Sequence, residues 1–181
     1  MAPRHGTSTE HGLLVGSFRD RENAERAYEA LVRRGYTREQ INVMMSDDVR
    51  KRYFPEREVD TELGNKAAEG GLAGAAVGGT VGAIAGVLAA AGTLAIPGLG
   101  IVLAGPLAAG LAGLGAGAAT GGLVGGLIGA GIPEEHAKVY EKDIKSGAIL
   151  VAVEPRSDDD LTYFEKEWGQ HGEVRVPRTY M

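Results

Sequence analysis

The side chains that most often carry catalysis are few in this chain and lie far apart. The histidines have no spacing typical of a metal-binding pair: His5, His11, His136 and His171. His136 follows Glu135 in the first turn of a predicted helix, where we expect a solvated position. The acidic run Asp158–Asp160 follows Ser157, a pattern typical of a capped helix start. We interpret it as capping rather than as a cation site, so the sequence predicts no metal site and no acid–base pair.

Two glycine-rich segments have the composition of phosphate-binding loops, at 98–100 and 115–122. A dinucleotide loop needs a preceding strand and usually an acidic ribose ligand about 20 residues later. Neither segment has both, so we expect no nucleotide cofactor. The chain contains no cysteine, which excludes thiol chemistry and cysteine-ligated metals. We therefore predict no catalytic, cofactor-binding or metal-binding residues and expect a protein that is not an enzyme.

The glycines instead indicate helix packing. Residues 70–133 contain no charged side chain, and two ladders of glycine recur there at every fourth position. A spacing of four keeps residues on one face of a helix, so each ladder is a stripe where another backbone can approach closely. We predict helix-packing roles for all ten: Gly70, Gly74, Gly78, Gly82, Gly86, Gly113, Gly117, Gly121, Gly125 and Gly129.

The charge of the chain limits which classes of partner it is expected to bind. The net charge is −5 and no strongly basic stretch occurs, which argues against nucleic acid. Arg50, Lys51 and Arg52 could contact anionic lipid headgroups, but neighbouring acidic residues neutralise them, which favours a solvated face. Residues 1–11 are polar and lack the apolar core of a secretory signal, so we expect a disordered N-terminus in the cytoplasm.

The flanks of the uncharged region show strand and helix periodicity. We predict strands at 13–18, 41–45, 148–153 and 173–176, and helices over 21–34, 46–53, 134–146 and 158–168. Ile41, Val43 and Met45 alternate with Asn42 and Met44, which predicts a strand with one buried face. Trp168 falls on the apolar stripe of its helix, so we expect a core position.

The resulting order, two β-α-β halves, is that of a ferredoxin-like α+β sandwich. We predict this domain over 12–46 and 148–177, with residues 47–147 inserted between its second and third strands. Two separate β-α fragments are the alternative, although neither alone could bury a core. Within the insertion we predict a helical hairpin at 66–131, interrupted at 94–105. Each helix, 66–91 and 106–131, would be roughly 39 Å long at 1.5 Å per residue, enough to cross a bilayer.

The segments 13–36, 41–54, 96–100 and 131–153 resemble bacterial general stress proteins, also labelled low-temperature-induced proteins. The resemblance implies a stress-linked, non-enzymatic membrane or assembly protein and supplies no catalytic residues.

Two functions remain open on the sequence alone. The first is a homo-oligomeric membrane protein whose hairpins pack through their glycine stripes, with both termini in the cytoplasm. The second is a soluble, cytoplasmic self-assembling oligomer with the hairpins at its centre. We prefer the membrane protein, and in either case expect the main partner to be another copy of the chain.

Overall fold

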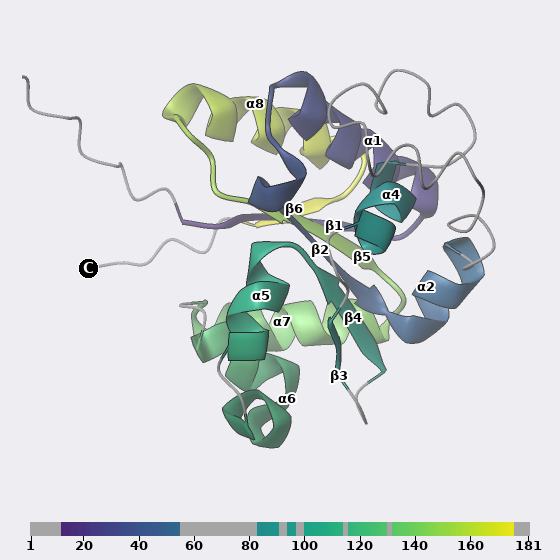
Figure 1. Cartoon of the computed structure of the whole chain (residues 1–181). Coiled ribbons are helices and arrows are strands. Elements are labelled where there is room, and N and C mark those ends of the chain that lie inside the picture. The colour runs from purple at the N-terminus through teal and green to yellow at the C-terminus, as the bar shows by residue number, and fades with distance from the viewer. Residues whose placement is uncertain are drawn as a thin grey trace, which may run out of the picture.

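The computed structural model describes residues 12–54, 83–90, 94–96, 100–113, 116–129 and 132–175. These residues form an α+β fold in which helices lie on both sides of one antiparallel sheet (Figure 1). The strands are β1 (Leu14–Phe18), β2 (Ile41–Ser46), β3 (Leu94–Ile96), β4 (Ile101–Ala104), β5 (Ile149–Val153) and β6 (Glu173–Arg175). The helices are α1 (Arg21–Arg33), α2 (Asp47–Tyr53), α4 (Ala83–Ala90), α5 (Pro106–Gly113), α6 (Ala116–Gly129), α7 (Glu134–Lys145) and α8 (Asp158–Gly169), with a 3-10 turn η1 (Arg38–Gln40).

Side-chain caps set where the predicted helices begin. Asp20 accepts a hydrogen bond from the Asn23 amide at 2.8 Å and starts α1, and Ser157 accepts from Asp160 at 3.1 Å and starts α8. Gly35 and Gly147 follow α1 and α7 with φ of 81° and 92°, a conformation that glycine adopts without steric cost. The four strands and four helices predicted in the flanks are confirmed, with bounds shifted by one or two residues at most.

The sheet has the strand order β3-β4-β2-β5-β1-β6, and every neighbouring pair is antiparallel. β5 lies in the middle, pairing Val151 with Gly16 of β1 on one side and with Val43 of β2 on the other. The two chain segments on either side of the uncharged region therefore share one sheet. The alternative of two separate β-α fragments is wrong for this reason.

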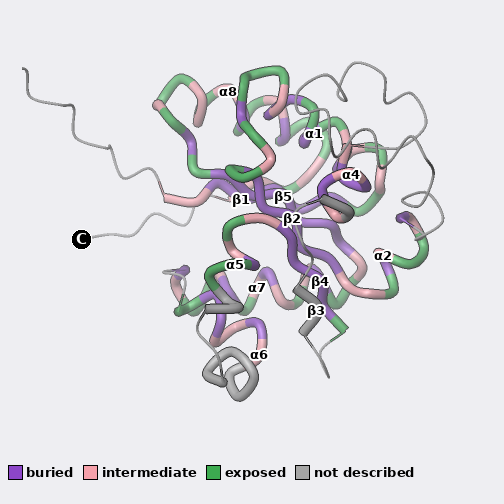
Figure 2. The backbone as a smooth tube through the Cα atoms, in the orientation of Figure 1, coloured by how far each residue is buried: buried purple, intermediate pink, exposed green. Residues whose placement is uncertain are grey.

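Both faces of the sheet are buried, which the sequence did not predict. Alternate β2 residues contribute to two cores: Ile41, Val43 and Met45 pack with α1, α4 and α8, whereas Met44 packs with α5, α6 and α7. Figure 2 shows buried residues along the central strands β1, β2 and β5. The prediction that β2 has one buried face is wrong, because the helices of the uncharged region cover the face that we expected to meet solvent.

The predicted hairpin of two long helices is also wrong where the structure describes it. Within 106–131 the described residues form two helices, α5 and α6, and α6 is itself interrupted at Gly122, whose φ of 62° and ψ of −161° are not helical. The expected interruption at 94–105 contains strands β3 and β4, which extend the sheet beyond β2. Of the predicted helix at 66–91, residues 83–90 form α4, and 66–82 lie outside the described residues.

A close approach between β2 and the start of α5 explains the turn at Gly105. Asn42, which is only 3 % exposed, accepts a hydrogen bond from the Leu107 amide at 2.7 Å and so caps α5 from a neighbouring strand. Gly105 has a φ of 98°, and a Cβ there would lie 2.2 Å from the Ile41 carbonyl oxygen. Only glycine fits between β4 and α5 at this position.

Candidate functional site

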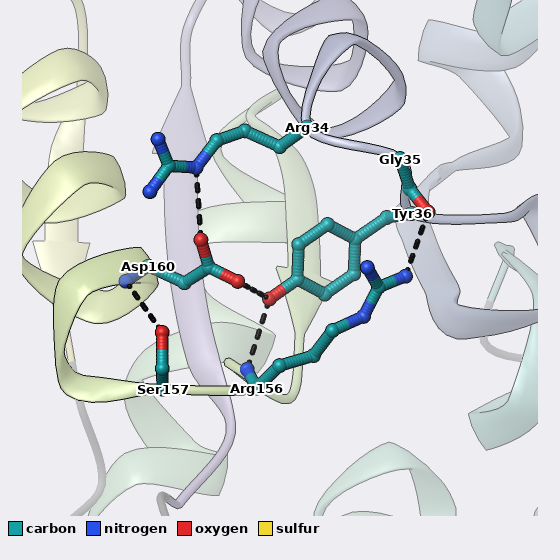
Figure 3. Close-up of polar contacts among 6 residues, drawn as sticks. All are labelled: Arg34, Gly35, Tyr36, Arg156, Ser157 and Asp160. Atoms are coloured by element: carbon teal, nitrogen blue, oxygen red, sulfur yellow. Dashed lines mark hydrogen bonds and ion pairs between the residues drawn. The ribbon is translucent and has the colours of Figure 1, made fainter.

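The most connected polar cluster, the polar junction, joins the end of α1 to the start of α8 and comprises Arg34, Tyr36, Arg156 and Asp160 (Figure 3). The Tyr36 hydroxyl donates to Asp160 Oδ2 at 2.7 Å, and Arg34 Nε donates to Asp160 Oδ1 at 2.8 Å. Both carboxylate oxygens of Asp160 are therefore engaged by residues more than 120 positions away in the sequence. The junction holds together the two halves of the chain that flank the uncharged region.

Arg156 closes the other side of the polar junction. Its amide donates to the Tyr36 hydroxyl at 2.9 Å, and its Nη2 donates to the Gly35 carbonyl and to Gln40 Oε1, each at 2.7 Å. The guanidinium carbon lies 4.0 Å from the centroid of the Tyr36 ring, within the range of a cation–π contact. Tyr36 is thus bonded at its hydroxyl and stacked on its ring, which fixes one side-chain conformation.

The environment of the polar junction shifts two pKa values in opposite directions. Burial, with the hydrogen bond to Asp160, raises the pKa of Tyr36 to about 12. Burial acts to raise the pKa of Asp160 as well, but the hydrogen bonds from Tyr36 and Arg34 outweigh it, and the pKa of this carboxyl is lowered. Near neutral pH the tyrosine is protonated and the aspartate ionised. These are the states of a structural hydrogen bond, whereas a general base would need a pKa near the working pH.

The histidines do not meet in the described part of the chain. His136 is partly buried, lies beside the Tyr140 ring with centroids 6.2 Å apart, and faces Glu135 at 3.7 Å. It is therefore less solvated than predicted. His171 is exposed after α8, and His5 and His11 lie outside the described residues. Within the described ranges no three His, Asp or Glu side chains are grouped closely enough to hold a metal ion.

The acidic run has a second role that the sequence did not predict. Ser157 provides the cap of α8, which fits the interpretation of this segment as a helix start. Asp160, however, also binds Tyr36 and Arg34 across the fold. Nothing local distinguishes Asp160 from Asp158 or Asp159, because its partners are brought to it only when β1, β2 and β5 pair.

Trp168 and the basic residues of α2 lie in the environments that we predicted for them. Trp168 is 1 % exposed and packs in the core against Phe18 and Phe164. Arg50 and Lys51 pair with Asp47, at 3.0 and 2.6 Å, as expected for a neutralised, solvated face.

The helix α6 has a buried face and an outer face of very different character. Leu123 and Leu127 are fully buried against the sheet. Val124 also packs against this core. The outer face consists of Gly125, Ile128 and Gly129, which lie at helical spacing (i, i+3 and i+4). Ile128 is 43 % exposed and is the one large hydrophobic side chain exposed in the described part of the chain. This α6 outer face therefore presents apolar atoms and bare backbone to its surroundings.

Six of the ten predicted helix-packing glycines lie in helices that the structure describes. Gly86 lies in α4, Gly113 ends α5, and Gly117, Gly121, Gly125 and Gly129 lie in α6. The remaining four, Gly70, Gly74, Gly78 and Gly82, lie outside the described residues. A Cβ added at Gly86 or at Gly125 would meet no atom of the described residues within 4 Å. Close packing against the described part of the chain therefore does not account for these two glycines.

None of the helices in the described ranges is both long enough and apolar enough to cross a membrane. The longest, α6, has 14 residues.

No protein-family model, curated protein or solved structure matches this chain.

Proposed function

We propose that this protein is not an enzyme but a self-associating protein, in which the α6 outer face packs against the same face of a second copy. The observation that carries the proposal is the exposure of Ile128 one turn after Gly125, a helix glycine whose added Cβ would meet no atom of the described residues within 4 Å. A glycine inside a helix costs about 1 kcal/mol relative to alanine in water. Close packing of a second helix against this glycine would compensate for that cost.

A second copy suits this face better than a charged partner does. Residues 70–133 carry no charge, so the α6 outer face offers nothing to complement an acidic or basic surface. Small residues at a spacing of four, with one larger side chain between them, are self-complementary in a two-fold contact. Ile128 of each copy would fill the space above Gly125 of the other.

A lipid environment is the second candidate, favoured by the uncharged run itself. In α6, however, the large apolar side chains Leu123 and Leu127 already pack against the sheet. What remains outside is mostly glycine, which suits contact between helices more than contact with acyl chains. The membrane location and the link to stress both remain proposals, the latter resting on the resemblance of the flanking segments alone.

We also propose that the flanks form a ferredoxin-like domain over 12–46 and 148–177. The order β2-β5-β1-β6, with α1 and α8 contributing to the same core, supports it. In this proposal residues 47–147 are an insertion between the second and third strands of that domain. The insertion adds two strands to the edge of the sheet and a helical layer to its other face.

Gly125→Leu tests the proposed interface. A Cβ at this position meets no atom of the described residues within 4 Å, and leucine is the better helix former, so we expect the unfolding free energy to be unchanged or up to about 1 kcal/mol higher. The same side chain overfills a close helix contact, and the dissociation constant of the dimer should rise about tenfold or more. Light scattering of the detergent-free protein over a range of concentrations measures the second effect.

Thr162→Leu is the matched control, because it adds leucine at an exposed position of α8, on the opposite side of the sheet. We expect its association to equal that of the unmodified chain. If Gly125→Leu and Thr162→Leu associate equally, or if the unmodified chain is monomeric throughout, contact through α6 is wrong. Recovery of the protein only in lipid or detergent would favour the second candidate.

A further inference from the structure

One helical turn of α1 holds the chain on both sides of the region 55–82. Arg21 donates through Nη1 to the Tyr53 carbonyl at 2.6 Å, and its guanidinium lies 4.9 Å from the centroid of the Phe54 ring. One turn later, Glu25 Oε2 accepts from the Ile84 amide at 3.0 Å. The described chain stops after Phe54 and resumes at Ala83. The residues just before and just after 55–82 are thus bound by two α1 residues that are four positions apart.

The Glu25 carboxylate is an unusual choice for this contact because it is buried. Its Oε1 accepts no hydrogen bond from the described residues and is paired with Arg21 at 3.6 Å, a longer contact than a hydrogen bond. Its side chain is only 13 % exposed. An amide or hydroxyl could accept the same Ile84 hydrogen bond without a buried charge. Glutamate therefore makes the attachment of α4 weaker than a neutral acceptor would.

Glu25 is also the polar contact that the structure provides between α1 and the first turn of α4. The remaining contacts are apolar: Ile84, Ala85 and Val87 are buried in the core that includes Ala24 and Tyr28. Detachment of α4 would expose these residues together, without breaking any pair of strands in the sheet. Glu25 therefore lies where α4 covers this apolar surface.

We propose that Glu25 is a pH-dependent anchor for α4, which holds the helix on α1 more tightly when its carboxyl is protonated and releases it more readily when ionised. The proposal concerns the opposite side of the sheet from α6 and does not depend on the proposed dimer.

The groups that face Glu25 set the direction of this dependence. Burial is the largest influence and raises its pKa; the amides of Ile84 and Ala83 and the charge of Arg21 oppose burial, and Glu29 adds to it. Tyr28 is buried nearby with its own pKa raised, so it stays neutral. Helix α4 contributes no charged side chain. When α4 is detached, Glu25 is solvated and returns toward its ordinary pKa of 4.5. The attached state binds the proton more tightly, so attachment weakens as pH rises above 4.5 and levels off beyond the raised value.

Amide hydrogen exchange of the full chain at pH 5 and pH 7.5 measures this attachment, once rates are corrected for the intrinsic effect of pH. We expect lower protection of the α4 amides at pH 7.5 than at pH 5, with the amides of β5 as an internal reference for global unfolding. Glu25→Gln keeps an acceptor without the charge. Its α4 protection should be the same at both pH values and higher than that of the unmodified chain at pH 7.5.

Glu25→Ala removes the acceptor and separates capping from ionisation. We expect its α4 protection to fall about fivefold at either pH, the size of effect typical of a lost helix cap. If protection in the unmodified chain is independent of pH or rises with it, or if Glu25→Gln behaves as the unmodified chain at pH 7.5, the proposal is wrong. It is equally wrong if α4 and β5 always exchange together, because α4 then has no separate opening.

Discussion

Gly105→Ala should be the most destabilising single-methyl change in the described part of the chain, lowering the unfolding free energy by about 4 kcal/mol or more. The new Cβ would lie 2.2 Å from the Ile41 carbonyl oxygen and 3.0 Å from the Asn42 Cα. Cβ has no rotamer and both neighbours are backbone atoms of a central strand, so relief requires moving β2 or α5. The φ of 98° adds strain for any residue with a side chain.

Gly100→Ala is the matched control for that substitution. Gly100 also has a positive φ, 61°, but a Cβ there meets no atom of the described residues within 4 Å. We expect only the cost of the left-handed conformation, about 1–2 kcal/mol. Urea denaturation followed by circular dichroism gives both free energies. Equal losses for the two variants would show that the contact between β2 and α5 is not as close as described here.

Asp160→Ala is expected to have the second-largest effect, a loss of about 3 kcal/mol. The substitution removes the acceptor of the buried Tyr36 hydroxyl and the ion-pair partner of Arg34, whose side chain is 35 % exposed. Asp159→Ala is the control, because Asp159 is exposed and shares the first turn of α8. Both variants lose an acid near the helix N-terminus, so the difference between them isolates the polar junction. A difference below about 0.5 kcal/mol would contradict its role.

The same residue makes stability depend on pH in a defined direction. The folded-state pKa of Asp160 is lowered below its ordinary value of 3.8, so the unfolded chain binds the proton more tightly. Its contribution to stability is therefore complete above pH 3.8 and lost as pH falls through the lowered value. The difference in unfolding free energy between the unmodified chain and Asp160→Asn should decrease as the pH falls from 3.8 through the lowered pKa. A difference that stays constant to pH 2 would show that ionisation of Asp160 is unimportant.

The flanking elements could be predicted from the sequence because their signals are local. Asp20 and Ser157 cap helices whose apolar stripes are regular, and the short apolar runs between them have the length of strands. The polar junction could not be found in the same way. Tyr36 and Asp160 are separated by 124 positions, and their contact depends on the pairing of β1 with β5.

The two long helices expected in the uncharged region are not formed where the structure describes it, and the reason is that its composition suits several environments equally. A run of glycine, alanine and leucine satisfies the length and charge criteria of a membrane hairpin. The same leucines fit the open face of a sheet, and Leu123 and Leu127 are buried there. Positive φ at Gly105 and Gly122 breaks the run into short elements. Glycines that permit close helix packing and glycines that terminate helices cannot be told apart by spacing alone.

Cross-linking through a single introduced cysteine tests the proposed α6 contact most directly, because the chain has no cysteine of its own. If Ile128 of each copy packs over Gly125 of the other, the two-fold axis passes between these positions, and the two Ile128 side chains lie within about one helical turn of each other along the helix axis. We predict that Ile128→Cys forms a covalent dimer rapidly with a short thiol-specific cross-linker in detergent-free buffer, whereas Thr162→Cys on α8 does not. Equal, slow cross-linking of the two variants at concentrations where the protein is associated would contradict the account.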